Sequence, residues 1–235
     1  EYQARWMQRS YYQHLPLQPL APAAIRQLLR DELGDDPSVA ALPEMIHART
    51  KGNPFFIEEV VQTLIESGHL SGTRSTYRLT TPIDALQVPA TVQAVLAARI
   101  DRLGDREKQV LQTAAVIGKT FGEALLRRVL GSVVTIDETA LGHAISTLIA
   151  SEFLFEAALY PDVEYSFKHP LTQEVAARSQ LRERRTRVHA VVAQALEETG
   201  GNLEERAAEI AQHWAEAGDT GRAARWHQRA AGWAS

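Results

Sequence analysis

Residues 153–167, FLFEAALYPDVEYSF, contain two short segments whose residues favour β-strands. The first covers residues 153–156 and the second residues 164–167, and both are rich in aromatic side chains. Between them, Pro161-Asp162 is typical of a turn. The stretch therefore predicts a β-hairpin, and its place after a series of helices decides the fold class.

Helical periodicity dominates the sequence before the hairpin. Apolar side chains recur at the spacing of one helix face in residues 92–103, 107–117, 123–130 and 137–150. The last three of these helices, followed by the hairpin, have the element order of a winged helix. We therefore predict a winged-helix domain over residues 90–170, within a chain that is mainly α.

Glycine and proline divide the N-terminal part into helices. Pro22 suits the first position of a helix whose apolar stripe ends at Gly34, and a second helix is predicted over residues 38–49. A third helix is predicted to start at the GNP stretch, residues 52–54, and to end at Gly68. These helices indicate a small helical subdomain.

The GNP stretch, Gly52-Asn53-Pro54, has the residue order of a junction between two helices. Glycine can take the left-handed cap of one helix, asparagine can N-cap the next, and proline fits its first turn. A short strand near residues 15–17 and a small hairpin ending at residues 77–79 are also predicted.

Residues 171–235 show helical periodicity throughout. One apolar stripe lies within residues 188–196 and another within residues 207–214, and a third follows the Gly218-Asp219 turn. Paired helices with small residues are typical of the first units of a TPR-like helical array. Such an array needs further repeats to bury its open face.

The composition is that of a globular protein without cysteine chemistry. The chain has 235 residues, of which 45% are hydrophobic, and a net charge of −4, which gives no electrostatic footprint for nucleic acid. It has no cysteine, so disulfides and thiolate zinc sites are excluded. No run of about 18 apolar residues and no signal peptide occur, and we expect a cytoplasmic protein without membrane contact. The chain starts at Glu1 rather than Met, so we expect a fragment of a longer protein.

The sequence Gly118-Lys119-Thr120 matches the last three residues of a phosphate-binding P-loop. A P-loop also needs a glycine five residues before the Gly-Lys pair, where this chain has Thr113, and it must follow a buried strand. Residues 107–112 have helical spacing instead. We therefore predict that Gly118 ends a helix and that the GKT sequence has no phosphate role.

No pattern in the sequence indicates a catalytic centre or a metal site. The eight histidines include no pair four residues apart and no H-E-x-x-H, and no Gly-x-Ser-x-Gly elbow occurs. The charged run RERRTR, residues 182–187, mixes signs at the start of an amphipathic helix. We interpret it as a solvated face rather than a phosphate site.

Two stretches remain as candidate binding sites, and each has a purely structural alternative. At residues 52–54 a helix begins with its unpaired N–H groups outward, which also describes a capped junction. At residues 167–171, FKHPL, Pro170 suits the first helical position, which makes His169 the N-cap beside Lys168. Oriented N–H groups, the imidazole and the ammonium favour an anion there, whereas the alternative is a histidine that only caps the helix.

Three stretches resemble the signal-transduction ATPases with numerous domains (STAND), a branch of the AAA-like ATPases. They are ARTKGNPFFIEEVVQTLIESGHL at residues 48–70, VPATVQAVLAARIDRLGDREKQVLQTAAVIGKTF at residues 88–121, and YSFKHPLTQEVA at residues 165–176. The chain is most similar to the ATPase regions that follow the catalytic domain in bacterial class III adenylate/guanylate cyclases. Large LuxR-type transcription regulators carry a related module.

The resemblance implies how the chain is divided. Residues 1–20, which open with EYQARW, would be the end of the nucleotide-binding core, after its sensor-1 strand. Residues 21–89 would be a helical lid, residues 90–170 the winged helix and residues 171–235 the start of the TPR-like region.

The resemblance also implies the residues that contact a nucleotide. Gly52, Asn53 and Pro54 would contact its base and sugar, and His169 would sense the β-phosphate of bound ADP. The Walker A and Walker B segments, which hold the phosphates and magnesium, would lie upstream of Glu1. ATP/ADP with Mg is therefore the cofactor expected in the longer protein, and none is expected to bind this chain alone.

We therefore expect a regulatory fragment of an ATP/ADP-switched signalling ATPase that is attached to a nucleotidyl cyclase. Its expected partners are the upstream nucleotide-binding core and proteins that bind the helical repeat region. One alternative is a transcription regulator that binds DNA, but residues 137–151, the presumed recognition helix, contain no arginine or lysine, and we expect no nucleic-acid binding. The other alternative is a protein-interaction scaffold with no nucleotide role.

Overall fold

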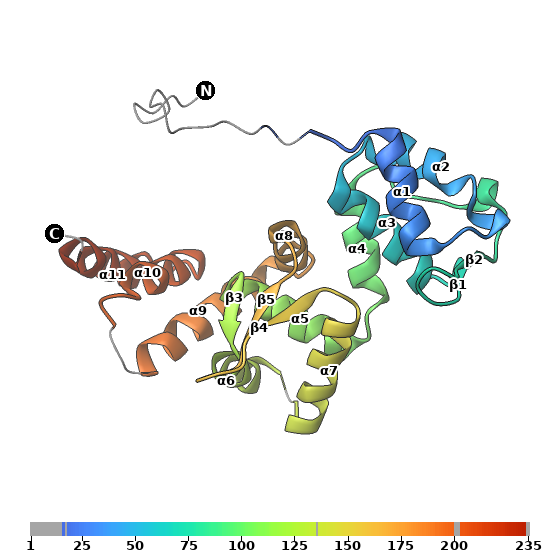
Figure 1. Cartoon of the computed structure of the whole chain (residues 1–235). Coiled ribbons are helices and arrows are strands. Elements are labelled where there is room, and N and C mark those ends of the chain that lie inside the picture. The colour runs from blue at the N-terminus through green and yellow to red at the C-terminus, as the bar shows by residue number, and fades with distance from the viewer. Residues whose placement is uncertain (1–15, 17, 135, 200–202, 234–235) are drawn as a thin grey trace. The chain divides into compact units, whose positions relative to one another are not determined.

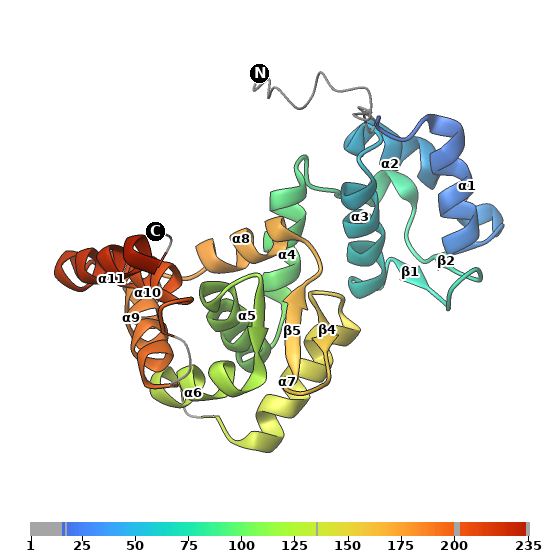
Figure 2. The ribbon, with the colours of Figure 1, turned by 60° about the vertical axis from the view of Figure 1, so that its left-hand side comes forward.

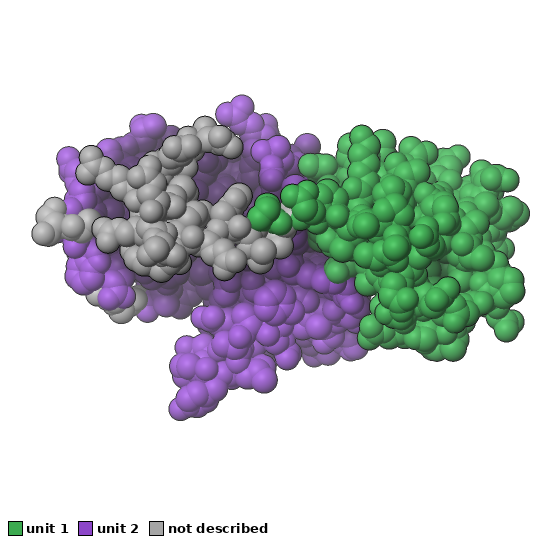
Figure 3. Space-filling model, turned by 45° about the horizontal axis from the view of Figure 1, so that its top comes forward, with its two compact units in different colours: residues 1–95 green, residues 96–235 purple. Residues whose placement is uncertain are grey.

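The computed structural model describes residues 16, 18–134, 136–199 and 203–233. Within these ranges the protein is mainly helical, with eleven α-helices and two small antiparallel sheets (Figure 1). The chain forms two compact units, Glu1–Val95 and Leu96–Ser235, which Figure 3 shows in different colours. The strand predicted near residues 15–17 and the core segment predicted for residues 1–20 lie largely outside the described residues.

The first unit consists of three helices and a small hairpin. Its elements are α1 (Pro22–Leu33), the 3-10 turn η2 (Pro37–Val39), α2 (Leu42–Thr50), α3 (Pro54–Glu66), β1 (Leu70–Ser71), β2 (Arg78–Leu79) and η3 (Ile83–Ala85). Leu70 lies opposite Leu79, which confirms the predicted hairpin. The helices turn their apolar stripes toward one core, which includes Ile25, Leu29, Ile46, Val60 and Leu64.

The second helix of this unit is shorter than the sequence predicts. Residues 38–49 have helical spacing, but α2 begins at Leu42. The side chain of Asp36 accepts the N–H of Ser38 (3.0 Å), and this contact starts a separate 3-10 turn. Pro43 has no N–H and is tolerated only in the first turn of a helix. The predicted helix start at Ser38 is therefore wrong.

The second unit begins within α4 (Val92–Arg102), close to the boundary predicted between residues 89 and 90. Its remaining elements are α5 (Asp105–Ile117), β3 (Thr120–Gly122), α6 (Glu123–Val133), α7 (Glu138–Ala150), β4 (Leu154–Ala158), β5 (Glu164–Phe167), α8 (Pro170–Arg178), α9 (Arg182–Glu198), α10 (Ala207–Glu216) and α11 (Thr220–Trp233). Figure 2 shows the same elements from a second direction.

The sheet of the second unit has three antiparallel strands in the order β3–β5–β4. The predicted hairpin is confirmed, with Leu154 opposite Phe167. The sequence does not predict β3, because three residues are too few to show a period. This strand pairs Phe121 with Tyr165 on the other side of β5.

The GKT sequence lies where α5 ends and β3 begins. The N–H of Gly118 donates to the carbonyl of Ala114 (3.2 Å), which closes the last turn of α5. Thr120 lies in β3, where its Oγ1 is 3.1 Å from the Oγ of Ser166. The predicted helix end at Gly118 is confirmed. A P-loop leads from a strand into a helix, and here a helix leads into a strand.

One continuous core joins the sheet to the helices of the second unit. Phe153 and Phe167 are at most 1% exposed, and the ring of Phe121 lies 6.0 Å from that of Phe167. The same core continues through Val188 on α9 to Ile210 on α10. The tail helices therefore share the core of the sheet instead of forming one of their own.

A carboxylate on α9 holds the last two helices. Glu197 accepts the indole N–H groups of Trp214 (2.6 Å) and Trp226 (2.7 Å). The guanidinium of Arg222 lies 4.3 Å from the Trp214 ring centroid, and that of Arg229 lies 4.2 Å from the Trp226 ring centroid. The predicted helical character of the tail is confirmed.

Replacing Phe167 with alanine should lower the free energy of unfolding by about 3–5 kcal/mol, because the change leaves a cavity between sheet and helices. Phe155 on β4 is 46% exposed, so Phe155→Ala should cost less than about 1 kcal/mol. Chemical denaturation of both variants measures the difference. Equal losses would contradict the assignment of Phe167 to the core.

Candidate functional site

The stretch Gly52-Asn53-Pro54 joins α2 to α3 with the capping geometry that its residues predict. Lys51 takes the left-handed conformation at the end of α2 (φ 50°), and Gly52 follows with φ 82°. The side chain of Asn53 accepts the N–H of Phe56 (3.0 Å), and Pro54 is the first residue of α3. The predicted N-cap at Asn53 is confirmed, whereas the left-handed cap begins one residue earlier than predicted.

Gly52 is also the point where two backbone segments come close together. The N–H of Leu20 donates to the carbonyl of Gly52 (2.8 Å). A Cβ at position 52 would clash with the carbonyl oxygen of Leu20 and lie 2.9 Å from its nitrogen. Packing and backbone conformation therefore both require glycine here, without any ligand.

His169 is the N-cap of α8, immediately after β5, as the sequence predicts. Its Nδ1 accepts the N–H of Leu171 (3.1 Å), and its backbone is extended. Its carbonyl accepts the N–H groups of Thr172 (3.0 Å) and Gln173 (3.4 Å). Because Pro170 has no N–H, His169 satisfies the backbone donors of the first turn.

These hydrogen bonds determine what the site offers to a ligand. A ring nitrogen that accepts a hydrogen bond carries no proton, so the proton of neutral His169 lies on Nε2. Nε2 is then the donor toward a bound group. The backbone N–H groups, which the sequence suggests as further anion ligands, are used within the protein, and that part of the prediction is corrected.

Lys168 places a positive charge beside His169. Its Nζ lies 2.5 Å from Oε2 of Glu152 on the protein surface. Exposed ion pairs of this kind contribute only about 0–1 kcal/mol. A ligand phosphate can therefore compete with Glu152 for this ammonium.

The two candidate stretches belong to different units. Gly52, Asn53 and Pro54 lie in the first unit and His169 in the second. Each stretch caps the helix that its sequence predicts it to cap. That they contact the same ligand stays a prediction.

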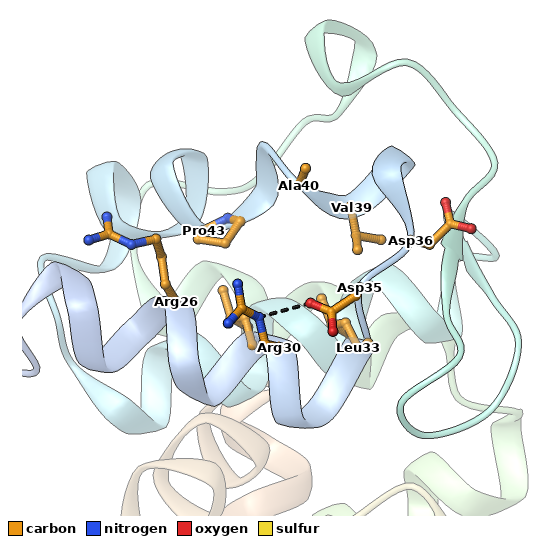
Figure 4. A pocket seen from close by; sticks show the side chains of 10 residues that line it. Arg26, Arg30, Leu33, Asp35, Asp36, Val39, Ala40 and Pro43 are labelled. Carbon is orange, nitrogen blue, oxygen red and sulfur yellow. Dashed lines mark ion pairs between the residues drawn. The ribbon is translucent and has the colours of Figure 1, made fainter.

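A small pocket in the first unit lies between α1 and the start of α2 (Figure 4). Arg30 pairs with Asp35 beside it (2.8 Å), and Leu29, Leu33 and Val39 contribute an apolar lining. Its volume of about 150 Å3 is below the roughly 300–1,000 Å3 of typical small-molecule sites. None of the predicted site residues lines this pocket.

A larger groove, of about 790 Å3, lies along α6 in the second unit. Arg127 on the groove wall pairs with Glu123 (2.6 Å) and with Glu138 (2.5 Å), and Asp162 and Glu164 also line the groove. The hydroxyl of Tyr165 donates to Glu123 (3.0 Å), and burial together with this carboxylate raises the pKa of Tyr165 to about 12. The tyrosine therefore stays protonated at neutral pH.

The second unit contains a buried histidine pair that was not predicted from the sequence. The Nδ1 atoms of His189 on α9 and His213 on α10 lie 2.9 Å apart, and His213 is 6% exposed. Burial, the neighbouring imidazole and Arg185 lower the pKa of His189 to about 4, and burial also lowers the pKa of His213. A signal was present, because His213 follows Ile210 by three residues on the apolar stripe of its helix.

The described residues contain no group of three His, Cys, Asp or Glu side chains close enough to hold a metal ion. In the same part of the chain, no helix has the length and apolar character needed to cross a membrane.

Comparison with known proteins leaves the function open. The chain is 28% identical over 191 residues to an uncharacterized protein of Rhizobium meliloti strain 1021. The match covers 80% of this chain and 18% of that protein, so the chain spans less than a fifth of its relative. No family model matches the chain, and no solved structure matches it.

Gly52→Ala should destabilise the first unit more than Gly68→Ala. Gly68 also has a positive φ (73°), but no atom lies within 4 Å of an added Cβ, so alanine there adds only conformational strain of about 1–2 kcal/mol. At position 52 the clash with Leu20 should add about 1–3 kcal/mol. Chemical denaturation measures both losses, and equal values would show that Leu20 does not approach Gly52 in solution.

The free energy of unfolding should fall as the pH is lowered from about 6.5 to about 4. Both buried imidazoles have lowered pKa values, so the unfolded chain binds more protons than the folded chain in this window. For His189 alone the expected loss between about pH 7 and pH 5 is roughly 1–3 kcal/mol. Denaturant unfolding at both pH values should show a smaller loss for His189→Gln than for the wild type.

The control for this experiment is His143→Gln, which changes an exposed histidine on α7. Its free energy of unfolding should fall with pH as much as that of the wild type. If His189→Gln loses as much free energy of unfolding at low pH as the wild type, the buried pair is not the source of the pH dependence.

Proposed function

We propose that this chain is the regulatory part of an ATP/ADP-switched signalling ATPase of the STAND type. The observation that carries the proposal is the setting of His169, which caps α8 through Nδ1, has its ring proton on Nε2 and is followed in the chain by the start of α8 and preceded by Lys168. Serine, threonine, aspartate and asparagine are the favoured N-caps, so capping alone does not account for an imidazole. A phosphate contact through Nε2 would account for the imidazole.

The proposal assigns a role to each part of the chain. Residues 21–89 are the lid, residues 90–170 are the winged helix, and residues 171–235 begin a TPR-like array. The element order supports the winged helix, because α5, α6 and α7 are followed by the β4–β5 hairpin, to which β3 adds a third strand.

In this proposal His169 donates from Nε2 to the β-phosphate of ADP and so favours the resting state. A hydrogen bond to a charged group contributes about 1.5–3 kcal/mol, and Lys168 adds attraction. A nearly complete switch needs an affinity difference of about 5 kcal/mol between the two states. His169 supplies only part of this difference, and the proposed base and sugar contacts of Gly52, Asn53 and Pro54 supply another part.

The proposed cofactor is ATP/ADP with Mg, held chiefly by Walker A and Walker B segments of a longer protein. We propose that this protein is cytoplasmic and that its effector is a nucleotidyl cyclase, as in the proteins that the sequence resembles. DNA binding has less support, since residues 137–151 provide no arginine or lysine for base or phosphate contacts.

Two substitutions of His169 separate a phosphate contact from a helix cap. In the natural protein that carries this chain, His169→Asn keeps a side-chain acceptor at the N-cap but removes the imidazole, whereas His169→Ala removes both. Both should weaken ADP binding about ten- to hundredfold. His169→Ala should also lower stability by about 1 kcal/mol. Calorimetric titration with ADP and chemical denaturation measure these effects.

The matched control is His143→Ala, on the exposed side of α7, which should leave ADP affinity and stability unchanged. If both His169 variants keep the wild-type ADP affinity, only the capping role remains and the proposal fails. A scaffold without a nucleotide role would instead show no ADP binding even in the wild type.

A further inference from the structure

The β4–β5 hairpin exposes two large apolar side chains at its tip and a third near the start of β4. Leu159 is 67% exposed, Tyr160 is 88% exposed, and Phe155 on β4 is 46% exposed. Turns are normally built from small and polar residues. Nothing within the hairpin requires apolar groups of this size at its tip.

The same hairpin carries three acidic residues. Glu156, Asp162 and Glu164 are all exposed, and within the described ranges none of them forms an ion pair. We call the three apolar and three acidic residues at positions 155–164 the hairpin surface. It combines exposed apolar side chains with three carboxylates that form no ion pair among the described residues.

The junction between α8 and α9 has the opposite charge. Leu181 is 80% exposed at the N-cap of α9 and makes no capping hydrogen bond. Arg182, Arg185 and Arg187 follow it, and none of them has an ion-pair partner in the part of the chain that the structure describes. By contrast, Arg178 on α8 pairs with Glu174 (2.9 Å). We call Leu181 and the three unpaired arginines the junction surface.

The junction surface breaks two local rules without a compensating contact in the chain. Leucine is a poor N-cap, and arginines in the first turn are unfavourable at the positive end of the helix dipole, an effect that Glu183 in the same turn partly offsets. Such conflicts with local preference are expected where a surface serves a function. A solvated face, as the sequence suggests for residues 182–187, explains the charges but not the exposed Leu181.

Both surfaces contain exposed apolar side chains, and their charges are opposite in sign. Among the described residues, the three acids without an ion pair on one correspond to the three arginines without an ion pair on the other. The β4–β5 loop precedes β5 and α8 follows it, and Figures 1 and 2 both show the loop and α8 at opposite ends of the sheet. The hairpin surface is therefore placed to meet the junction surface of another molecule.

We propose that the hairpin surface of one copy of this chain docks on the junction surface of a second copy. The contact is heterologous, so each copy keeps one free surface of each kind and assembly continues head to tail or closes into a ring. The surfaces are small, and their association is weak and dependent on concentration and salt. This inference does not rest on the proposed nucleotide switch.

A second copy fits these observations better than a polyanion. A nucleic acid would use only the arginines and would be repelled by a chain of net charge −4 and by the acidic hairpin surface. It would leave Leu159, Tyr160 and Leu181 without a partner.

Sedimentation velocity of the full chain tests the proposal with two variants, each of which removes one surface. Leu159→Ser/Tyr160→Ser removes the hairpin surface, and Leu181→Ser/Arg185→Ser removes the junction surface. The wild type should show a mean mass that rises with concentration and passes that of a dimer, less so at high salt. Each variant alone should remain monomeric. Their equimolar mixture should form a 1:1 dimer and nothing larger, because only one intact contact is left.

The matched control is Leu28→Ser/Arg49→Ser, which removes an exposed leucine and an unpaired arginine from the first unit and should associate like the wild type. The proposal is wrong if the wild type stays monomeric up to about 0.5 mM, a range that covers weak interfaces. It is also wrong if the mixed variants do not dimerise, or if a short single-stranded DNA binds the arginines of a chain that does not self-associate.

Discussion

The burial of Phe167 is the constraint on which the second unit depends. Its side chain is fully buried, its N–H donates to the carbonyl of Lys119 (2.9 Å), and Leu154 lies opposite it on β4. Because only Lys168 separates Phe167 from His169, the anchored end of β5 also sets the start of α8. The imidazole that we propose as a phosphate contact therefore belongs to a rigid part of the molecule, which is the setting that a precise contact needs.

Most helices and the hairpin could be predicted because their signals are local. Apolar spacing marks a helix within a few turns, and a cap such as Asn53 or His169 involves residues three positions apart at most. The predicted start of α2 is wrong because apolar spacing continues before Pro43, whereas that proline fits only the first turn of a helix. The short strand β3 had no local signal, since its pairing with β5 is a tertiary contact.

The buried polar contacts could not be predicted because they join residues distant in the sequence. Glu197 meets two tryptophans from two other helices, and His189 meets His213 across 24 positions. The candidate sites differ in how much the structure adds to the sequence. Capping and the approach of Leu20 account for Gly52 and Asn53 without a nucleotide, so their ligand contacts rest on the resemblance. For His169 the structure adds a chemical assignment, an Nε2 donor held in place by the cap.

The most direct measurement is an experimental structure of the natural protein that carries this chain, with ADP bound. The account predicts that Nε2 of His169 lies within about 3.2 Å of a β-phosphate oxygen, while Nδ1 keeps its hydrogen bond from the N–H of Leu171. A structure in which ADP is bound and Nε2 faces solvent or a protein carbonyl would contradict the account.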